Sequence, residues 1–217
     1  MPVPKHARPT AHRATRSKKR SDRGRISVVG DMHGNRIQVT TPIEASFRVV
    51  EPSLTLCAAV EHDGDVRRRI LALKYQNDRG QAATLAEFLV PLLQDIEPHP
   101  QAITWAPTTT RRVRERGLDQ AEWLARAVAR ELHLPCKRLL KRVNRESQAG
   151  QNRLIRLSRP RFRARVRRDV RCVVVIDDVI TTGATLRAAA QALRAEGVEH
   201  VHAVAVTYRR RGRGAHR

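Results

Sequence analysis

The residue types best suited to chemistry lie together between Val173 and Thr185, in the stretch Val-Val-Val-Ile-Asp-Asp-Val-Ile-Thr-Thr-Gly-Ala-Thr. The four leading β-branched residues are typical of a strand covered on both faces, as in a parallel sheet, and ligands bind at the carboxyl ends of such strands. There Asp177 and Asp178 can accept hydrogen bonds from the hydroxyls of a sugar. Backbone N–H groups at the start of the following helix can hold a phosphate. The residues that supply them are Thr181, Thr182, Gly183, Ala184 and Thr185. The stretch therefore predicts a sugar-phosphate site.

A second interpretation of the same stretch is an ordinary connection from a strand to a helix. In that case the two acids cap the helix and Gly183 only turns the chain. The order of strand, acids, glycine and three threonines is the order that a phosphate site requires, and it favours the first interpretation.

The composition indicates polyanionic partners. Lysine and arginine number 43 against 21 acidic residues, which gives the 217-residue chain a net charge of +22. Aromatic residues make up only 3% of the chain, which argues against platforms that stack single-stranded bases. Any contact with nucleic acid is therefore expected to be electrostatic. The length suits one domain with appendages.

The cysteines and the hydropathy exclude several classes of protein. Cys57, Cys136 and Cys172 are odd in number and far apart, so neither a disulfide framework nor a metal cluster is expected. No apolar run approaches the ~20 residues of a membrane span, and the basic N-terminus lacks the apolar core of a secretory signal. We expect a cytoplasmic protein without a membrane span. The arginine-rich N-terminus leaves an organellar transit peptide as the alternative.

The N-terminal third is expected to be peripheral. Residues 1–25 predict a disordered basic tail, and residues 26–62 predict a small β-rich appendage. Within the appendage, Gly30-Asp-Met-His-Gly-Asn35 is interpreted as a hairpin turn. Its likeness to the first motif of binuclear-metal phosphoesterases leaves a metal site as the alternative.

Residues 63–208 predict the main domain. Apolar spacing between Gly64 and Leu93 predicts two helices around a turn at 77–80, and residues 102–107 predict a short strand. Residues 108–112 are interpreted as a second anion-binding loop. A third helix is expected near Asp119, which would form a capping box with Glu122. The alternation of helices and strands predicts an α/β fold with a parallel sheet.

Residues 137–171 carry fourteen basic and two acidic residues without clear periodicity. A stretch of this length inside a compact domain favours a mobile lid, and a solvated basic loop without a single role is the alternative. Residues 209–217 predict a second basic tail.

Four segments together resemble the ComF family, phosphoribosyltransferase-like proteins associated with DNA uptake and competence in bacteria. They are Leu71-Ala-Leu-Lys-Tyr75; Ala106-Pro-Thr with Arg111, Arg112 and Arg116-Gly-Leu-Asp-Gln120; Ser147-Gln148; and Val173 to Thr185. The resemblance implies a type I phosphoribosyltransferase-like parallel sheet flanked by helices. Members of the family often begin with a Cys-x-x-Cys zinc module, which is missing here, so no zinc is expected.

The resemblance also implies roles for individual residues. Asp177 and Asp178 would hold the ribose hydroxyls directly or through Mg²⁺, and residues 181–185 would hold the 5′-phosphate. Arg111 and Arg112 would support the departing pyrophosphate. The remaining substrate-binding candidates are Thr108, Lys74 and Gln148.

Two functions remain open on the sequence. The first is an Mg²⁺-dependent phosphoribosyltransferase that acts on phosphoribosyl pyrophosphate or a nucleotide, linked to DNA uptake or nucleotide salvage. The second is a non-catalytic or regulatory protein that binds DNA through its basic tails and loop. The acceptor base or amine cannot be read from the residues, and a homodimer would be usual for the superfamily.

Overall fold

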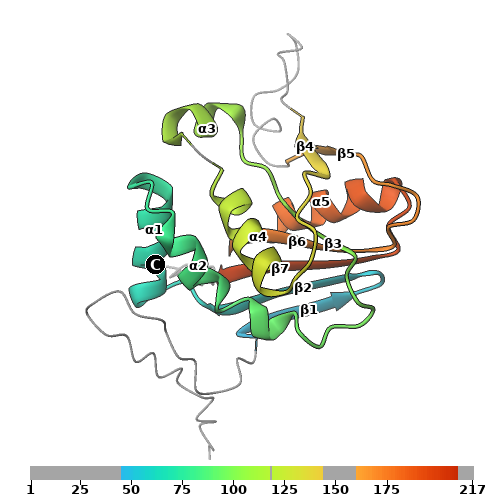
Figure 1. Cartoon of the computed structure of the whole chain (residues 1–217), viewed down its shortest axis with the longest axis horizontal. Coiled ribbons are helices and arrows are strands. Elements are labelled where there is room, and N and C mark those ends of the chain that lie inside the picture. The colour runs from blue at the N-terminus through green and yellow to red at the C-terminus, as the bar shows by residue number, and fades with distance from the viewer. Residues whose placement is uncertain (1–44, 118, 144–159, 210–217) are drawn as a thin grey trace, which may run out of the picture.

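The structure, a computed structural model, describes residues 45–117, 119–143 and 160–209 (Figure 1). Its centre is a five-stranded sheet in the order β1-β2-β7-β6-β3. All neighbouring strands are parallel except β1 and β2. The strands are β1 (Phe47–Glu51), β2 (Leu54–Glu61), β3 (Ala102–Trp105), β6 (Cys172–Ile180) and β7 (His200–Tyr208). This sheet, flanked by helices, confirms the predicted α/β fold class.

The continuous apolar run of β6 is explained by burial on both faces of the sheet. Val174 and Ile176 belong to one core cluster, and Val173 and Val175 belong to the other. Because side chains alternate along a strand, a strand between two cores needs apolar residues at every position. The four residues are fully buried.

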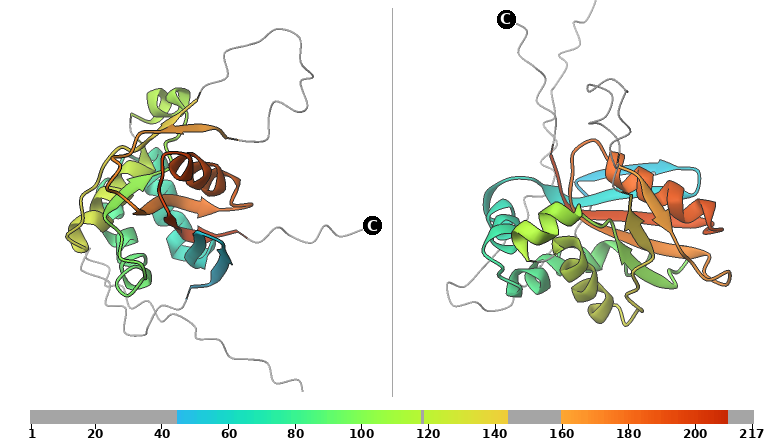
Figure 2. Two further views of the ribbon diagram at one scale, coloured as in Figure 1. Left: turned by 90° about the vertical axis from the view of Figure 1, so that its right-hand side faces the viewer. Right: turned by 90° about the horizontal axis from the view of Figure 1, so that it is seen from above.

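Helices cover both faces of the sheet (Figure 2). The first core cluster packs the sheet against α1, α2 and α4, and the second packs it against α5. The helices are α1 (Gly64–Tyr75), α2 (Gly80–Ala86), α3 (Thr110–Arg116), α4 (Gln120–Glu131) and α5 (Ala184–Ala195), with a 3-10 turn, η1 (Val90–Leu92). The two helices and the turn predicted between residues 64 and 93 are confirmed. None of the described helices is long and apolar enough to cross a bilayer.

The predicted capping box at the start of α4 does not form. Asp119 occupies the N-cap position, but its side chain makes no capping hydrogen bond, and Glu122 pairs with Arg126 at 2.7 Å. The Asp119 carboxylate instead accepts a hydrogen bond from the Thr108 N–H at 3.1 Å. This carboxylate therefore ties α4 to the segment after β3.

The basic stretch 137–171 contains structure that the sequence did not predict. Strands β4 (Leu140–Arg142) and β5 (Phe162–Ala164) form an antiparallel pair, and residues 144–159 between them lie outside the described residues. Leu140 is buried, and Phe162 packs against the second core cluster. The prediction of a mobile lid over the whole stretch therefore does not hold for its two ends, because these apolar side chains pack against α5 and the second core cluster.

Residues 45–62 belong to the main sheet. β2 pairs in parallel with β7 from Leu54 to Glu61, and β1 adds an antiparallel edge. The described part of the expected appendage is therefore built into the domain that was predicted to begin at residue 63. The predicted hairpin at 30–35 and the tail 1–25 lie outside the described residues, as does the tail 209–217 beyond Arg209.

Candidate functional site at the carboxyl end of β6

The acid pair lies in the second half of β6, the strand between β3 and β7. Asp177 is in register with Ala205 of β7, and the strand continues past both acids to Ile180. The strand is thus longer than its apolar run. Its last residues carry the carboxylates to the edge of the sheet from which the loop into α5 departs. That edge is where parallel sheets place their ligands.

Lys74, in the last turn of α1, reaches this acid pair. Its Nζ lies 2.8 Å from Asp178 Oδ2, and the two side chains are only 19% and 14% exposed. The structure therefore brings Lys74 to an acid pair that lies about a hundred positions later in the sequence. An ion pair this shielded from water is held more firmly than one on an open surface.

The pKa of the Asp177 carboxyl is raised from 3.8 to about 8. Burial is the main cause of this rise, and the charge of neighbouring Asp178 adds to it. Two contacts oppose the rise. They are the Asp178 N–H, which donates to Asp177 Oδ1 at 2.8 Å, and the positive charge of Lys74. A buried carboxyl beside a second one keeps its proton to higher pH. Lys74 therefore supplies the counter-charge for Asp178, and the raised pKa favours the protonated form of Asp177.

Asp119 and Arg142 join the site although the sequence did not single them out for it. Burial raises the pKa of Asp119, and the charge of Asp178 contributes. Burial lowers the pKa of Arg142, as does nearby Arg112, while Asp177 and Asp119 raise it. The Asp119 position was visible within the Arg116-to-Gln120 motif. Arg142 had no distinguishing signal within the basic run.

Arg142 is held over the site by its surroundings. Its Nη1 donates to the Pro107 carbonyl at 3.4 Å, and its guanidinium lies 5.5 Å from the centre of the Phe162 ring. These contacts come from the segment after β3 and from β5. The pairing of β4 with β5 is thus what places a half-buried cation near the acid pair.

The predicted phosphate loop runs from Thr181 to Thr185. Gly183 has φ +73°, the left-handed conformation that glycine adopts without strain, and it forms the N-cap of α5. The N–H of Ala184 donates to Thr182 Oγ1 at 3.3 Å. The first N–H groups of a helix have no partner within the helix, so the start of α5 offers donors just after the end of β6.

The segment expected to form a second anion loop is a short helix. Thr109 caps α3 by accepting a hydrogen bond from the Arg112 N–H at 3.3 Å. Arg111 is 87% exposed and pairs with Glu115 at 2.7 Å, whereas Arg112 lies close enough to Arg142 to lower its pKa. Of these two arginines, Arg112 is therefore the one that lies near Arg142. Ser147 and Gln148 lie outside the described residues.

The described residues contain no cluster of three or more histidine, cysteine or acidic side chains that could hold a metal ion. Cys57, Cys136 and Cys172 are free thiols. A metal ion at the acid pair would therefore take most of its ligands from a bound molecule or from water.

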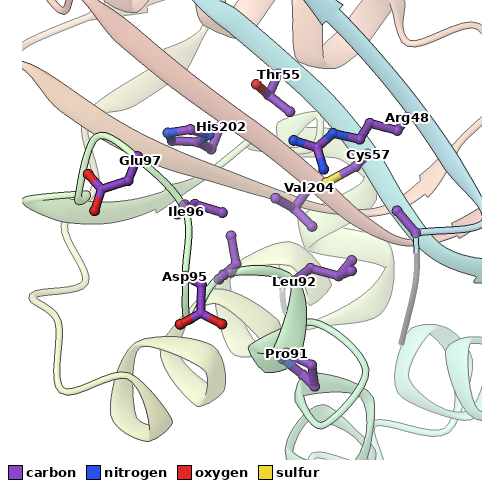
Figure 3. A pocket seen from close by; sticks show the side chains of 12 residues that line it. Arg48, Thr55, Cys57, Pro91, Leu92, Asp95, Ile96, Glu97, His202 and Val204 are labelled. Carbon is purple, nitrogen blue, oxygen red and sulfur yellow. The ribbon is translucent and has the colours of Figure 1, made fainter. Parts of the chain in front are cut away.

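A separate cavity of about 710 Å³ lies at the amino ends of β2 and β7 (Figure 3). Thr55 and Cys57 line it from β2, His202 lines it from β7, and residues 91–97 cover it. The acid pair lies toward the opposite ends of the strands, so this cavity is distinct from the candidate site.

Comparison with known proteins assigns the C-terminal part of the chain. Residues 118–217 match the family model of the phosphoribosyl transferase domain. No curated protein sequence matches the chain. The chain is also similar to two solved structures, which are both adenine phosphoribosyltransferases. The enzyme from Leishmania donovani is 15% identical with a TM-score of 0.41, over 74% of this chain and 84% of that one. The enzyme from Trypanosoma brucei, solved with AMP, pyrophosphate and ribose-5-phosphate, is 14% identical with a TM-score of 0.41, over 76% and 87%.

The matched segment begins just before α4 and contains β6, the acid pair and the loop into α5. Lys74, which contacts Asp178, and residues 108–112 lie before the matched segment. On this family match, the C-terminal part of the chain is phosphoribosyltransferase-like.

Proposed function

We propose that the chain binds phosphoribosyl pyrophosphate, or a nucleotide carrying ribose 5-phosphate, at the carboxyl end of β6 and transfers phosphoribose to an acceptor. The observation that carries the proposal is the convergence of three features. These are a lysine-neutralised acid pair, a left-handed glycine that opens α5, and the half-buried Arg142. The carboxylates can accept hydrogen bonds from sugar hydroxyls, and the N-terminus of α5 can donate hydrogen bonds to a phosphate. These two groups are complementary to opposite ends of one sugar phosphate.

Each part of the ligand has matching chemistry in this site. Asp177 and Asp178 would accept hydrogen bonds from the ribose hydroxyls. The N–H groups of residues 181–185 would bind the 5′-phosphate. Thr108 and Arg112, supported by Arg142, would face the pyrophosphate. Arg111, which is engaged with Glu115, would act there only after leaving that partner.

Magnesium fits this donor set in a limited way. Mg²⁺ is usually held by one or two carboxylates together with phosphate oxygens and water, and the site offers two carboxylates. Asp177 and Asp178 would hold it, with Asp178 shared with Lys74. When bound, the ion would supply positive charge to the pyrophosphate. Because the pKa of Asp177 is raised, binding of the ion by its carboxylate would become more favourable as pH rises.

The transfer breaks the bond between ribose C1 and a pyrophosphate oxygen and forms a bond from C1 to a nitrogen of the acceptor. Pyrophosphate leaves with the electron pair of the broken bond, and the acceptor nitrogen loses a proton. Negative charge therefore grows on the pyrophosphate, where Arg112 and Arg142 would stabilise it. Positive charge grows on the ribose, near the carboxylates. The chain's task is to hold the sugar between these groups and exclude water.

The finer family assignment, a ComF-like protein linked to DNA uptake or nucleotide salvage, rests on the sequence motifs. Leu71-Ala-Leu-Lys-Tyr75 forms the end of α1 and delivers Lys74 to the acid pair. A motif that is particular to this branch of the superfamily therefore contributes a side chain to the site. This contact supports the ComF-like proposal over a general phosphoribosyltransferase.

The transferase proposal is tested by pyrophosphate release. The full chain is incubated with phosphoribosyl pyrophosphate, Mg²⁺ and a panel of purine and pyrimidine bases, and released pyrophosphate is measured. Release that requires one base and is lost in Asp178→Asn supports the proposal. The absence of base-dependent release across the panel counts against the enzyme and favours a binding function.

A second candidate is a regulatory DNA-binding protein that uses the sugar-phosphate site to sense a nucleotide. The net charge of +22 favours it. The two functions differ in salt dependence, because a pocket that binds one small ligand neutralises few phosphates. The retention of two carboxylates beside so much positive charge favours a working pocket.

A further inference from the structure

Arg187 of α5 joins the phosphate loop to the edge strand of the sheet. Its Nε and Nη2 donate to Glu51 Oε1 of β1 at 2.9 and 2.7 Å, and its Nη1 donates to the Thr182 carbonyl at 3.0 Å. All three guanidinium nitrogens are thus engaged within the chain. One side chain connects β1, α5 and the loop that was assigned to the 5′-phosphate.

Gly183 is the residue that permits this arrangement. A Cβ at position 183 would lie 2.6 Å from Arg187 Nη1 and 2.8 Å from Leu56 Cδ2. The guanidinium therefore packs directly against the peptide of the loop, on the side next to β2. Its hydrogen bond to the Thr182 carbonyl fixes the plane of the peptide between Thr182 and Gly183, and so the direction of the Gly183 N–H.

The ion pair contributes little as a stabilising contact. The side chains of Arg187 and Glu51 are 40% and 38% exposed, and pairs at such exposure are typically worth 1 kcal/mol or less. Its geometry is more specific than its energy, because a planar guanidinium can serve a carboxylate and a carbonyl at the same time. A lysine ammonium in the same place cannot reproduce that fork.

We propose that Glu51 and Arg187 are positioning residues for the 5′-phosphate. Glu51 orients Arg187, and Arg187 holds the Thr182 peptide so that the loop N–H groups point to the phosphate before the ligand arrives. The pair does not itself contact the ligand. This inference rests on the proposed binding of phosphoribosyl pyrophosphate.

The test compares two ligands that use different parts of the site. Calorimetric titration measures the affinity for phosphoribosyl pyrophosphate, which carries the 5′-phosphate, and for inorganic pyrophosphate, which does not, both with Mg²⁺. Arg187→Lys keeps the positive charge and removes the fork, and Glu51→Ala removes the orienting carboxylate. We expect each variant to lower the affinity for phosphoribosyl pyrophosphate about tenfold and to change the affinity for inorganic pyrophosphate less than twofold.

The matched control is Arg126→Lys. Arg126 contacts Glu122 Oε1 through the same two nitrogens at 3.0 and 2.7 Å, on the surface of α4. The Arg126→Lys variant should leave the affinities for both ligands unchanged. The charge-swapped Glu51→Arg with Arg187→Glu restores an ion pair but no donor to the Thr182 carbonyl, so it should stay as weak as the single variants even if its thermal stability returns.

The outcomes separate this inference from the function it rests on. If the parent chain binds phosphoribosyl pyrophosphate and both single variants bind it equally well, the positioning role is overturned and the proposed function stands. Equal loss of both ligands would also overturn it, because that is general damage to the site. If the parent chain binds no phosphoribosyl pyrophosphate, the proposed function fails, and this inference fails with it.

Discussion

Lys74 Nζ lies 2.8 Å from Asp178 Oδ2, so a helix on one face of the sheet supplies the counter-charge for the acid pair at its carboxyl end. Both side chains are largely shielded from water. The contact joins the end of α1 to the phosphoribosyltransferase-like segment. Variants of Lys74 therefore test whether these two segments form one site.

Replacing Lys74 by methionine should destabilise the protein and raise the Mg²⁺ concentration that it needs to bind phosphoribosyl pyrophosphate. Asp178 would be left without its cation beside Asp177, and removing one partner of a buried pair costs about 3 kcal/mol. Thermal unfolding should show a clear loss at neutral pH. Titrations of phosphoribosyl pyrophosphate should show weaker binding at low Mg²⁺ that recovers as Mg²⁺ rises.

Lys74→Arg is the control for this change, because it keeps the charge. The double variant Lys74→Met with Asp178→Asn should recover part of the lost stability, since the unpaired charge is gone. If Lys74→Met alone unfolds at the parent temperature, Lys74 does not neutralise a shielded carboxylate.

The raised pKa of Asp177 predicts a specific pH dependence of stability. The folded-state pKa is about 8 and the ordinary value is 3.8, so the folded protein favours the protonated form. The stability contribution of this group is fully present below about pH 4 and is lost as pH rises through about 8. Asp177→Asn should remove the loss. The free energy of unfolding of Asp177→Asn, relative to that of the parent chain, should rise by more than about 1 kcal/mol between pH 5 and pH 8.5.

Chemical denaturation at the two pH values measures this difference. Asp169→Asn is the control, because Asp169 is exposed and pairs with Arg167 on the surface. A difference between Asp177→Asn and the parent chain that stays constant with pH would show that Asp177 is ionised in the folded protein.

Gly183→Ala should weaken binding of the 5′-phosphate by more than its backbone strain alone explains. The left-handed conformation costs an alanine about 1–2 kcal/mol, and the new Cβ would also collide with Arg187 and Leu56. Gly117→Ala is a matched control, because Gly117 has the same φ of +73° with nothing within 4 Å of a Cβ. Both variants should lose stability, and Gly183→Ala should lose more of it.

Binding of phosphoribosyl pyrophosphate by these two variants completes the comparison. The affinity for phosphoribosyl pyrophosphate should fall by at least tenfold in Gly183→Ala. In Gly117→Ala it should stay within about threefold of the parent value, since the cost of that substitution is local strain. Equal affinities in the two variants would mean that the turn before α5 does not hold the ligand.

DNA binding should depend on the basic ends of the chain. Residues 1–25 and 209–217 together carry fourteen of the 43 lysines and arginines. Each phosphate contact contributes about 0.9 to the slope of log affinity against log salt. Deleting both segments should lower that slope, measured by fluorescence anisotropy on a duplex of unrelated sequence. An unchanged slope would place any DNA contact on the rest of the chain.

Local patterns in the sequence predicted β6, the two helices between residues 64 and 93, helix α4 and the turn before α5, but not α3. Continuous β-branched residues and helical spacing are local signals, so these elements could be read without knowledge of their neighbours. Lys74 was a candidate through its motif. Its contact with Asp178 depends on how α1 packs against the sheet.

The features that the sequence did not predict depend on contacts between distant segments. The parallel pairing of β2 with β7 joins residues about 150 positions apart, so the sequence indicated a separate β-rich appendage over residues 26–62. Arg142 becomes part of the site only because β4 pairs with β5. Asp119 was expected to cap α4, and its bond to the Thr108 N–H could not be read from spacing.

The most direct test is calorimetric titration of phosphoribosyl pyrophosphate, with and without Mg²⁺, into the parent chain and into Asp177→Asn with Asp178→Asn. A site of this construction predicts micromolar, Mg²⁺-dependent binding that the double variant loses while it remains folded. No binding to the parent chain, or equal binding to both proteins, would contradict a phosphoribosyl site at the acid pair.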